Sequence, residues 1–128
     1  MATTKKCTSK SRAGRLDKAK QFLAAAEMIT PITEGIDLAD AFVTLCVHAG
    51  IAASDVICCA RLNEHSIGGN HNSAIALLAR VDKGHAIHLK TLLDMKGHAG
   101  YSDISVTTEY QISAKLAAQT LVTAATLV

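Results

Sequence analysis

Residues 37–61, DLADAFVTLCVHAGIAASDVICCAR, decide the fold of this protein. In a helix that turns by about 100° per residue, the polar side chains of this stretch share one narrow arc. These side chains are Asp37, Asp40, Thr44, His48 and Asp55. Apolar side chains cover most of the remaining surface. A helix that is apolar on nearly all sides must be covered by several neighbours, so the stretch predicts the central helix of an all-helical bundle.

The same stretch is long enough to span a membrane, but the interpretation as a buried helix is preferred. His48 and Asp55 would lie inside the span, and no aromatic residues flank it. These two residues are seven positions apart and therefore share one face. They are either polar groups tied to neighbouring helices or the lining of a ligand site, to which Arg61 and His71 are also assigned.

Composition predicts one domain of 128 residues, with helices packed closely because aromatic residues make up 3% of the chain and Trp is absent. The cysteines show no CxxC spacing, so we expect free thiols and a reducing, cytoplasmic location. They are Cys7, Cys46, Cys58 and Cys59. No hydrophobic signal segment precedes the domain, so export is not expected.

The first twenty residues hold seven Lys and Arg against Asp17, a balance of +6, whereas the rest holds six basic and ten acidic residues, a balance of −4. We predict a disordered basic arm over residues 1–13, followed by a single helical domain over residues 14–128. The arm is either a solubilising tail or a nucleic-acid contact that acts through counterion release. The candidate nucleic-acid contacts are Lys5, Lys6, Lys10, Arg12 and Arg15.

Apolar spacing predicts further helices on both sides of the central one, and Gly-containing segments separate them. Short connections favour antiparallel neighbours, so we predict an up-and-down bundle of four to five helices with one short connecting helix. The expected helices cover residues 15–29, 73–81 (the short one), 85–96 and 107 or 108 onward, with a loop over residues 97–105.

Five consecutive sequence signals together resemble the HEPN family over about residues 16–127. They are VHAGIAASDVICCARL, a Gly-containing loop ending in His71, ALLARV, LLDMKGHAGYSD and AKLAAQTLVTAA. HEPN proteins are helical bundles, often dimeric, that occur as toxin ribonucleases, as partners of minimal nucleotidyltransferases and as small defence or stress modules. The resemblance implies an HEPN-like fold and a homodimer. It also implies RNA, a nucleotide or a cognate protein, such as a nucleotidyltransferase-like protein, as the partner.

The HEPN catalytic signature is R-x4-6-H, in which Arg holds the scissile phosphate and His assists attack by the ribose 2′-hydroxyl. Members that lack the His read R-x-x-A-x-Y, and residues 96–101 here read KGHAGY. The resemblance therefore assigns Lys96, His98 and Tyr101 as catalytic candidates, although Lys holds phosphate less specifically than Arg and Tyr, with a pKa near 10, is a poor base. In the alternative interpretation Lys96 and Tyr101 have only a structural role and hold the loop against the core. The Tyr101 hydroxyl then donates a hydrogen bond to a carboxylate such as Asp55.

A second match to R-x4-H joins Arg80 to His85, one helix too early for the family pattern. His85 and His88, three residues apart, could also bind a metal with His71 or His98. The spacing shows no full ligand set, so we expect neither a metal nor a cofactor.

Three hypotheses for function follow from these patterns. The preferred one is a catalytically weak or inactive HEPN-like module, of the toxin–antitoxin or defence type, that binds nucleic acid, a nucleotide or a protein. The second is a metal-independent endoribonuclease of the same fold. The third is a structural or regulatory helical dimer without a ligand.

Overall fold

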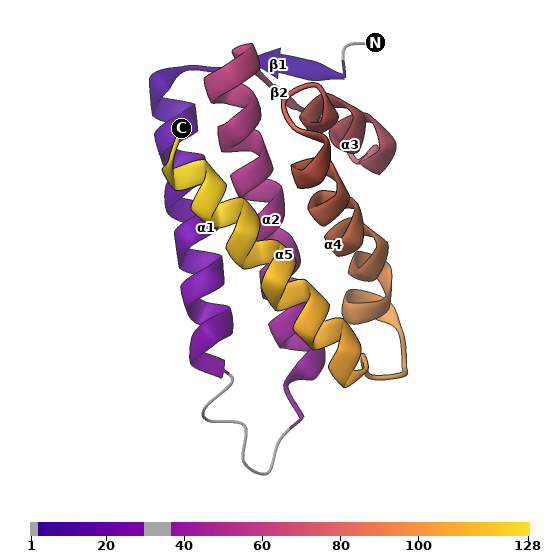
Figure 1. The fold of residues 1–128 in the computed structure, drawn as a ribbon. Helices are drawn as coiled ribbons and strands as arrows, with labels where there is room; N and C mark the ends of the chain where they lie inside the picture. The colour runs from indigo at the N-terminus through magenta and orange to yellow at the C-terminus, as the bar shows by residue number, and fades with distance from the viewer. Residues whose placement is uncertain (1–2, 30–36) are drawn as a thin grey trace.

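The computed structural model describes residues 3–29 and 37–128. Four long helices alternate in direction and a short helix connects two of them (Figure 1). This confirms the predicted up-and-down helical bundle. The helices are α1 (Ser9–Ile29), α2 (Ala39–Leu62), α3 (His71–Ala79, the short one), α4 (Lys83–Tyr101) and α5 (Thr108–Thr126), and two short strands are β1 (Thr4–Lys6) and β2 (Glu64–Ser66).

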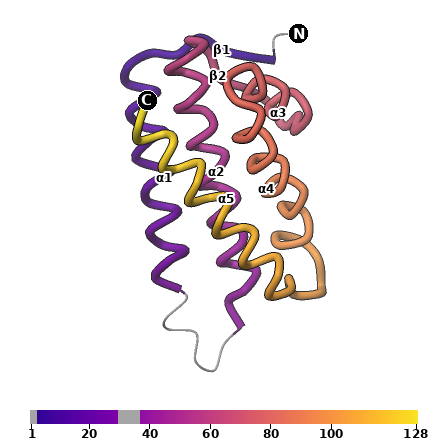
Figure 2. The backbone as a smooth tube through the Cα atoms, viewed as in Figure 1, coloured from indigo at the N-terminus to yellow at the C-terminus, as the bar shows by residue number. Residues whose placement is uncertain are grey.

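The predicted central helix is confirmed as α2, which packs against α1, α4 and α5 and also contacts β2 and α3 (Figure 2). Thirteen of its 24 residues are buried. Within the described residues, α2 is the one helix long and apolar enough to cross a membrane, but 72% of its apolar window is buried inside the protein. Packing against neighbouring helices therefore accounts for its apolar surface.

A glycine lets the helices approach closely at the middle of α2. A Cβ atom at Gly50 would collide with Cδ1 of Leu92 on α4 and would lie 3.5 Å from Cδ1 of Leu121 on α5. Both leucines are fully buried. The absence of a side chain at Gly50 is thus a packing requirement of the α2, α4 and α5 contact.

The predicted disordered arm over residues 1–13 is wrong for the part that the structure describes. Residues 4–6 form β1, which pairs antiparallel with β2 so that Lys5 lies opposite His65. Helix α1 then begins at Ser9, six residues before the predicted start. Its first turn is closed by a reciprocal cap, since the backbone N–H groups of Thr8 and Ser11 each donate to the other residue's hydroxyl oxygen at 3.0 Å.

The prediction of four free thiols is wrong for two of them, because Cys7 and Cys59 form a disulfide. Their Cα atoms are 5.6 Å apart although 52 positions separate them in sequence, so spacing alone could not reveal the bond. Cys46 and Cys58 are free and buried, and burial raises the pKa of each thiol to about 12. The cytoplasmic location, which we inferred partly from free thiols, stays a prediction.

Helices α3 and α4 each begin two residues earlier than predicted because the preceding residue caps them. Oδ1 of Asn70 accepts from the backbone N–H of Ser73 at 3.1 Å, and Oδ1 of Asp82 accepts from that of His85 at 2.9 Å. Thr107 caps α5, whose predicted start is confirmed.

The predicted loop over residues 97–105 is too long, since α4 continues to Tyr101. The true connection to α5 is tied to the start of α2. Asp37 accepts a hydrogen bond from the Ser105 hydroxyl, and Asp40 accepts one from the backbone N–H of Val106, both at 2.9 Å. Two of the five polar side chains that were predicted to share one arc therefore serve the fold: Asp37, just before α2, and Asp40 in its first turn.

Candidate functional site

A pocket of about 380 Å³ lies where α1, α2 and α4 meet the segment from β2 to α3. This volume is within the usual range for small-ligand sites. Its apolar wall includes Ile51, Leu89 and Leu93. Its polar side chains are Arg15, Ser54, Asp55, His65, Ser66, Asn70, His71 and Lys96.

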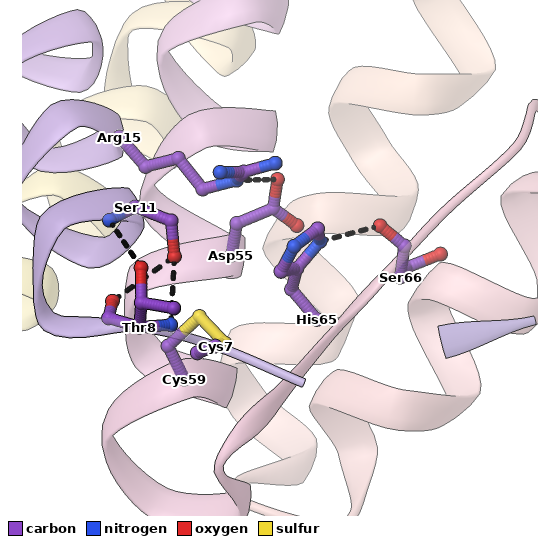
Figure 3. Close-up of a disulfide and its surroundings, with 8 residues drawn as sticks. All are labelled: Cys7, Thr8, Ser11, Arg15, Asp55, Cys59, His65 and Ser66. Carbon is purple, nitrogen blue, oxygen red and sulfur yellow. Dashed lines mark hydrogen bonds and ion pairs between the residues drawn. A yellow bond between two sulfur atoms is a disulfide. The ribbon is translucent and has the colours of Figure 1, made fainter. Parts of the chain in front are cut away.

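An ion pair between α1 and α2 forms one wall of this pocket. Nε of Arg15 donates to Oδ2 of Asp55 at 3.1 Å (Figure 3). Burial raises the pKa of Asp55, whereas its hydrogen bond with Arg15 and the charges of His65 and Arg15 act in the opposite direction. Asp55 thus fits both sequence interpretations, because it is tied to a neighbouring helix and also lines a pocket.

His65 is a pocket residue that the sequence did not single out. Its side chain is buried, and its ring lies between Asp55 and Ser66 (Figure 3). Nδ1 donates to the backbone carbonyl of Ser66 at 2.9 Å, because a carbonyl can only accept. In the neutral ring this leaves Nε2 as an acceptor. The pairing of β1 with β2 places His65, and no local sequence signal predicts that pairing.

A second hollow, of about 690 Å³, lies between α1 and α2 next to the first pocket. The two share Arg15, Ile51 and Asp55 as a common wall. We call this second hollow the α1–α2 groove. Its other lining residues are Thr8, Lys10, Ser11, Gly14, Lys18, Phe22, His48 and Ala52.

Positive charge dominates the two adjoining sites. Their described lining includes the fixed cations Lys10, Arg15, Lys18 and Lys96, against Asp55 as the carboxylate. That carboxylate is already bound by Arg15. The pair of sites is therefore suited to an anionic ligand.

The residues predicted to line a ligand site are brought together in part. Asp55 and His71 line the 380 Å³ pocket, and His48 lines the α1–α2 groove. Arg61 does not join them, since it lines a separate hollow of about 200 Å³ near the end of α5. Its position on α2, six residues past Asp55, turns it toward a different neighbour.

The three residues taken from the family signature do not converge. Lys96 lines the pocket, whereas His98 packs edge-on against Tyr110 of α5 with ring centroids 5.9 Å apart. Nε2 of His98 is buried without a hydrogen-bond partner among the described residues. Tyr101 is 85% exposed, so the predicted bond from Tyr101 to Asp55 is wrong. The physical reason is that α4 continues through these positions, so that two steps of about 100° turn His98 away from the face of Lys96. Tyr101 is the last residue of α4 and is exposed there.

The two residues of the second signature match do not line a common site either. Arg80 pairs with Glu64 at 3.7 Å, and His85 lines the hollow that contains Arg61. Within residues 3–29 and 37–128, no group of three or more His, Cys, Asp or Glu side chains could hold a metal ion. The pair His85 and His88 therefore has no ligand set in the described part of the chain.

The five basic residues assigned to nucleic-acid binding near the amino terminus divide into two groups. Lys10 and Arg15 line the α1–α2 groove. Lys5 and Lys6 are exposed on β1, and Nη2 of Arg12 donates to the carbonyl of Val128 at 3.0 Å. Two of the five candidate residues therefore line a candidate ligand site.

Neither a model of a known protein family nor a curated protein matches this chain. The HEPN resemblance therefore stays a prediction.

Proposed function

We propose that this protein is a small helical module that binds a phosphate-bearing ligand, a nucleotide or a nucleic acid, in the 380 Å³ pocket. The observation that carries the proposal is the convergence of Arg15 from α1 and Lys96 from α4 on one pocket. Asp55, the carboxylate there, is held by Arg15.

The donors around the pocket fit a phosphate group. Asp55 occupies Nε of Arg15, so the terminal guanidinium nitrogens can donate to phosphate oxygens. Lys96 supplies a second charge from α4, and His71 supplies a ring nitrogen. Apolar side chains that line the pocket lower the local dielectric constant, which strengthens each of these contacts.

The arrangement supports binding more than catalysis. A metal-independent ribonuclease needs a base and a phosphate-holding cation within reach of one bound phosphodiester. His98 packs on Tyr110, and Tyr101 is exposed at the end of α4. Lys96 thus lines the pocket without the two partners that the family signature would give it. This separation favours the catalytically inactive module among the three hypotheses.

Binding of fluorescein-labelled single-stranded RNA in EDTA tests the proposal. Lys96→Ala should weaken binding about tenfold and reduce the slope of log affinity against log salt by about one. Lys90→Ala is the matched control, because Lys90 is on the same helix but pairs with Asp94 at the surface. It should change neither the affinity nor the slope.

Each other result has a definite meaning. Equal affinity for the wild type and Lys96→Ala, or an equal loss with both lysine variants, would contradict the pocket as the phosphate site. A thermal stability lowered by Lys96→Ala with unchanged binding would show that Lys96 only supports the fold. Cleavage of the RNA by the wild type that is lost in Lys96→Ala would replace the binding module with the ribonuclease.

A further inference from the structure

The α1–α2 groove continues the phosphate pocket across a shared wall. Arg15, Ile51 and Asp55 line both, so a ligand whose phosphate is held by Arg15 can extend into either. The groove is the larger of the two, at about 690 Å³ against about 380 Å³. One phosphate group cannot fill both spaces, and the shared Arg15 indicates a ligand with parts on either side of it.

An aromatic pair forms one side of this groove. The rings of Phe22 on α1 and His48 on α2 have centroids 5.5 Å apart and an angle of 34° between their planes. His48 is exposed, although it is placed on a helix that is otherwise mostly buried. An exposed flat ring backed by a second ring is a surface on which a nucleobase can stack.

Among the Phe and Tyr side chains of the described residues, Phe22 lines the α1–α2 groove. The chain has few aromatic residues, and Phe42 is in the core while Tyr110 packs on His98. Among the described residues, no other Phe or Tyr lines either of the two sites. The stacking surface thus occurs beside the phosphate pocket.

Two lysines follow the groove along α1. Lys10, Gly14 and Lys18 are spaced four residues apart and share one face of the helix. The two lysines are therefore separated by about 12 Å along the helix axis. A Cβ at Gly14 would meet no atom within 4 Å, so the space above the helix between the two lysines is open. Cations beside an open stacking surface match the backbone and bases of a nucleic-acid strand.

We infer that the α1–α2 groove is a base-stacking subsite and that the ligand is single-stranded nucleic acid of two or more nucleotides, which crosses Arg15. The inference rests on the proposed function, since Arg15 and Lys96 hold one phosphate in the adjoining pocket. A base of the neighbouring nucleotide stacks on His48, and Lys10 and Lys18 face the next phosphates. A duplex keeps its bases stacked on one another and cannot use this surface.

The test compares three ligands on folded protein, with circular dichroism to verify the fold of each variant. They are adenosine monophosphate, an eight-nucleotide oligoadenylate RNA, and a backbone of the same length without bases. The RNA should bind the wild type at least tenfold more tightly than the monophosphate does. His48→Ala should weaken RNA binding roughly tenfold, as expected for the loss of one stacked base, and should leave the affinity for the abasic backbone unchanged.

A second variant separates stacking from charge. His48→Phe keeps a ring at this exposed position and should retain most of the affinity for RNA. Equal losses with His48→Ala and His48→Phe would overturn the stacking role. Binding of duplex RNA as tight as that of the single strand would also overturn it.

The variants keep this inference distinct from the proposed function. Lys96→Ala should weaken binding of all three ligands, because each carries phosphate. If Lys96→Ala does so while His48→Ala changes nothing, the phosphate site stands and the stacking subsite is wrong. If Lys96→Ala has no effect on any of the three ligands, the proposed function fails and the inference fails with it.

Discussion

At the scale of single residues, Asp55 couples the candidate site to stability. Its pKa in the folded protein is raised above the usual 3.8, mainly by burial. A carboxyl group with a raised pKa binds its proton more tightly in the folded than in the unfolded chain. The folded state therefore gains stability as pH falls from neutral toward 3.8, and loses that gain as pH rises again.

Replacing Asp55 by Asn should remove this pH dependence. As pH falls from 7 toward about 4, the free energy of unfolding of the wild type should rise relative to that of Asp55→Asn. Urea denaturation at a series of pH values measures the difference. If the wild type instead loses stability relative to the variant as pH falls, Arg15 outweighs burial and lowers the pKa of Asp55.

Two glycines on helices make a matched pair for packing. Gly50→Ala places a methyl group against the buried Leu92 and should lower the free energy of unfolding by about 1–2 kcal/mol, because overpacking outweighs the better helix propensity of Ala. Gly97→Ala on α4 meets nothing within 4 Å and should raise the free energy of unfolding by up to about 1 kcal/mol. Thermal denaturation of both variants tests the contrast, and shifts of the same sign would contradict it.

At the scale of elements, the disulfide holds β1 and the start of α1 against the end of α2. It joins residues 52 positions apart. Loop-closure entropy for a loop of this length predicts a contribution of about 4 kcal/mol to the free energy of unfolding. Cys7→Ser should cost an amount of this order in denaturant titrations without reductant.

Reduction provides the control for the disulfide. Dithiothreitol should destabilise the wild type to the level of Cys7→Ser and should leave Cys7→Ser itself unchanged, since Cys46 and Cys58 are free in the structure. An unchanged wild type under complete reduction would contradict the prediction. Because β1 pairs with β2, which carries His65, reduction should also speed hydrogen exchange at residues 64–66.

The elements also show which local signals can be read from sequence. The central helix was predicted to within two residues at its start and one at its end, because its apolar pattern is local. The basic charge of the first residues predicts a disordered arm, but the Thr8 and Ser11 cap, a signal that the sequence does contain, begins α1 at Ser9. The loop predicted from residue 97 onward begins too early, because α4 continues through Gly97 and Gly100 to Tyr101.

At the scale of the whole molecule, the homodimer implied by the family resemblance stays a prediction. Sedimentation velocity at micromolar concentration should give a mass of about twice 13.4 kDa. A single species at the monomer mass would contradict it. The same run with and without RNA would show whether ligand binding changes the assembly.

The sequence by itself determined the helical class, the number of helices and the central place of α2, because helix formation and burial follow from patterns within a few turns. It also pointed to Asp55, His71 and Lys96 as site candidates. Only the tertiary structure decided that Arg15 meets Asp55 across 40 positions, that Cys7 bonds Cys59, and that His98 and Tyr101 lie away from the pocket. These pairings depend on how separate helices pack and on which face each side chain takes, and no local pattern encodes either.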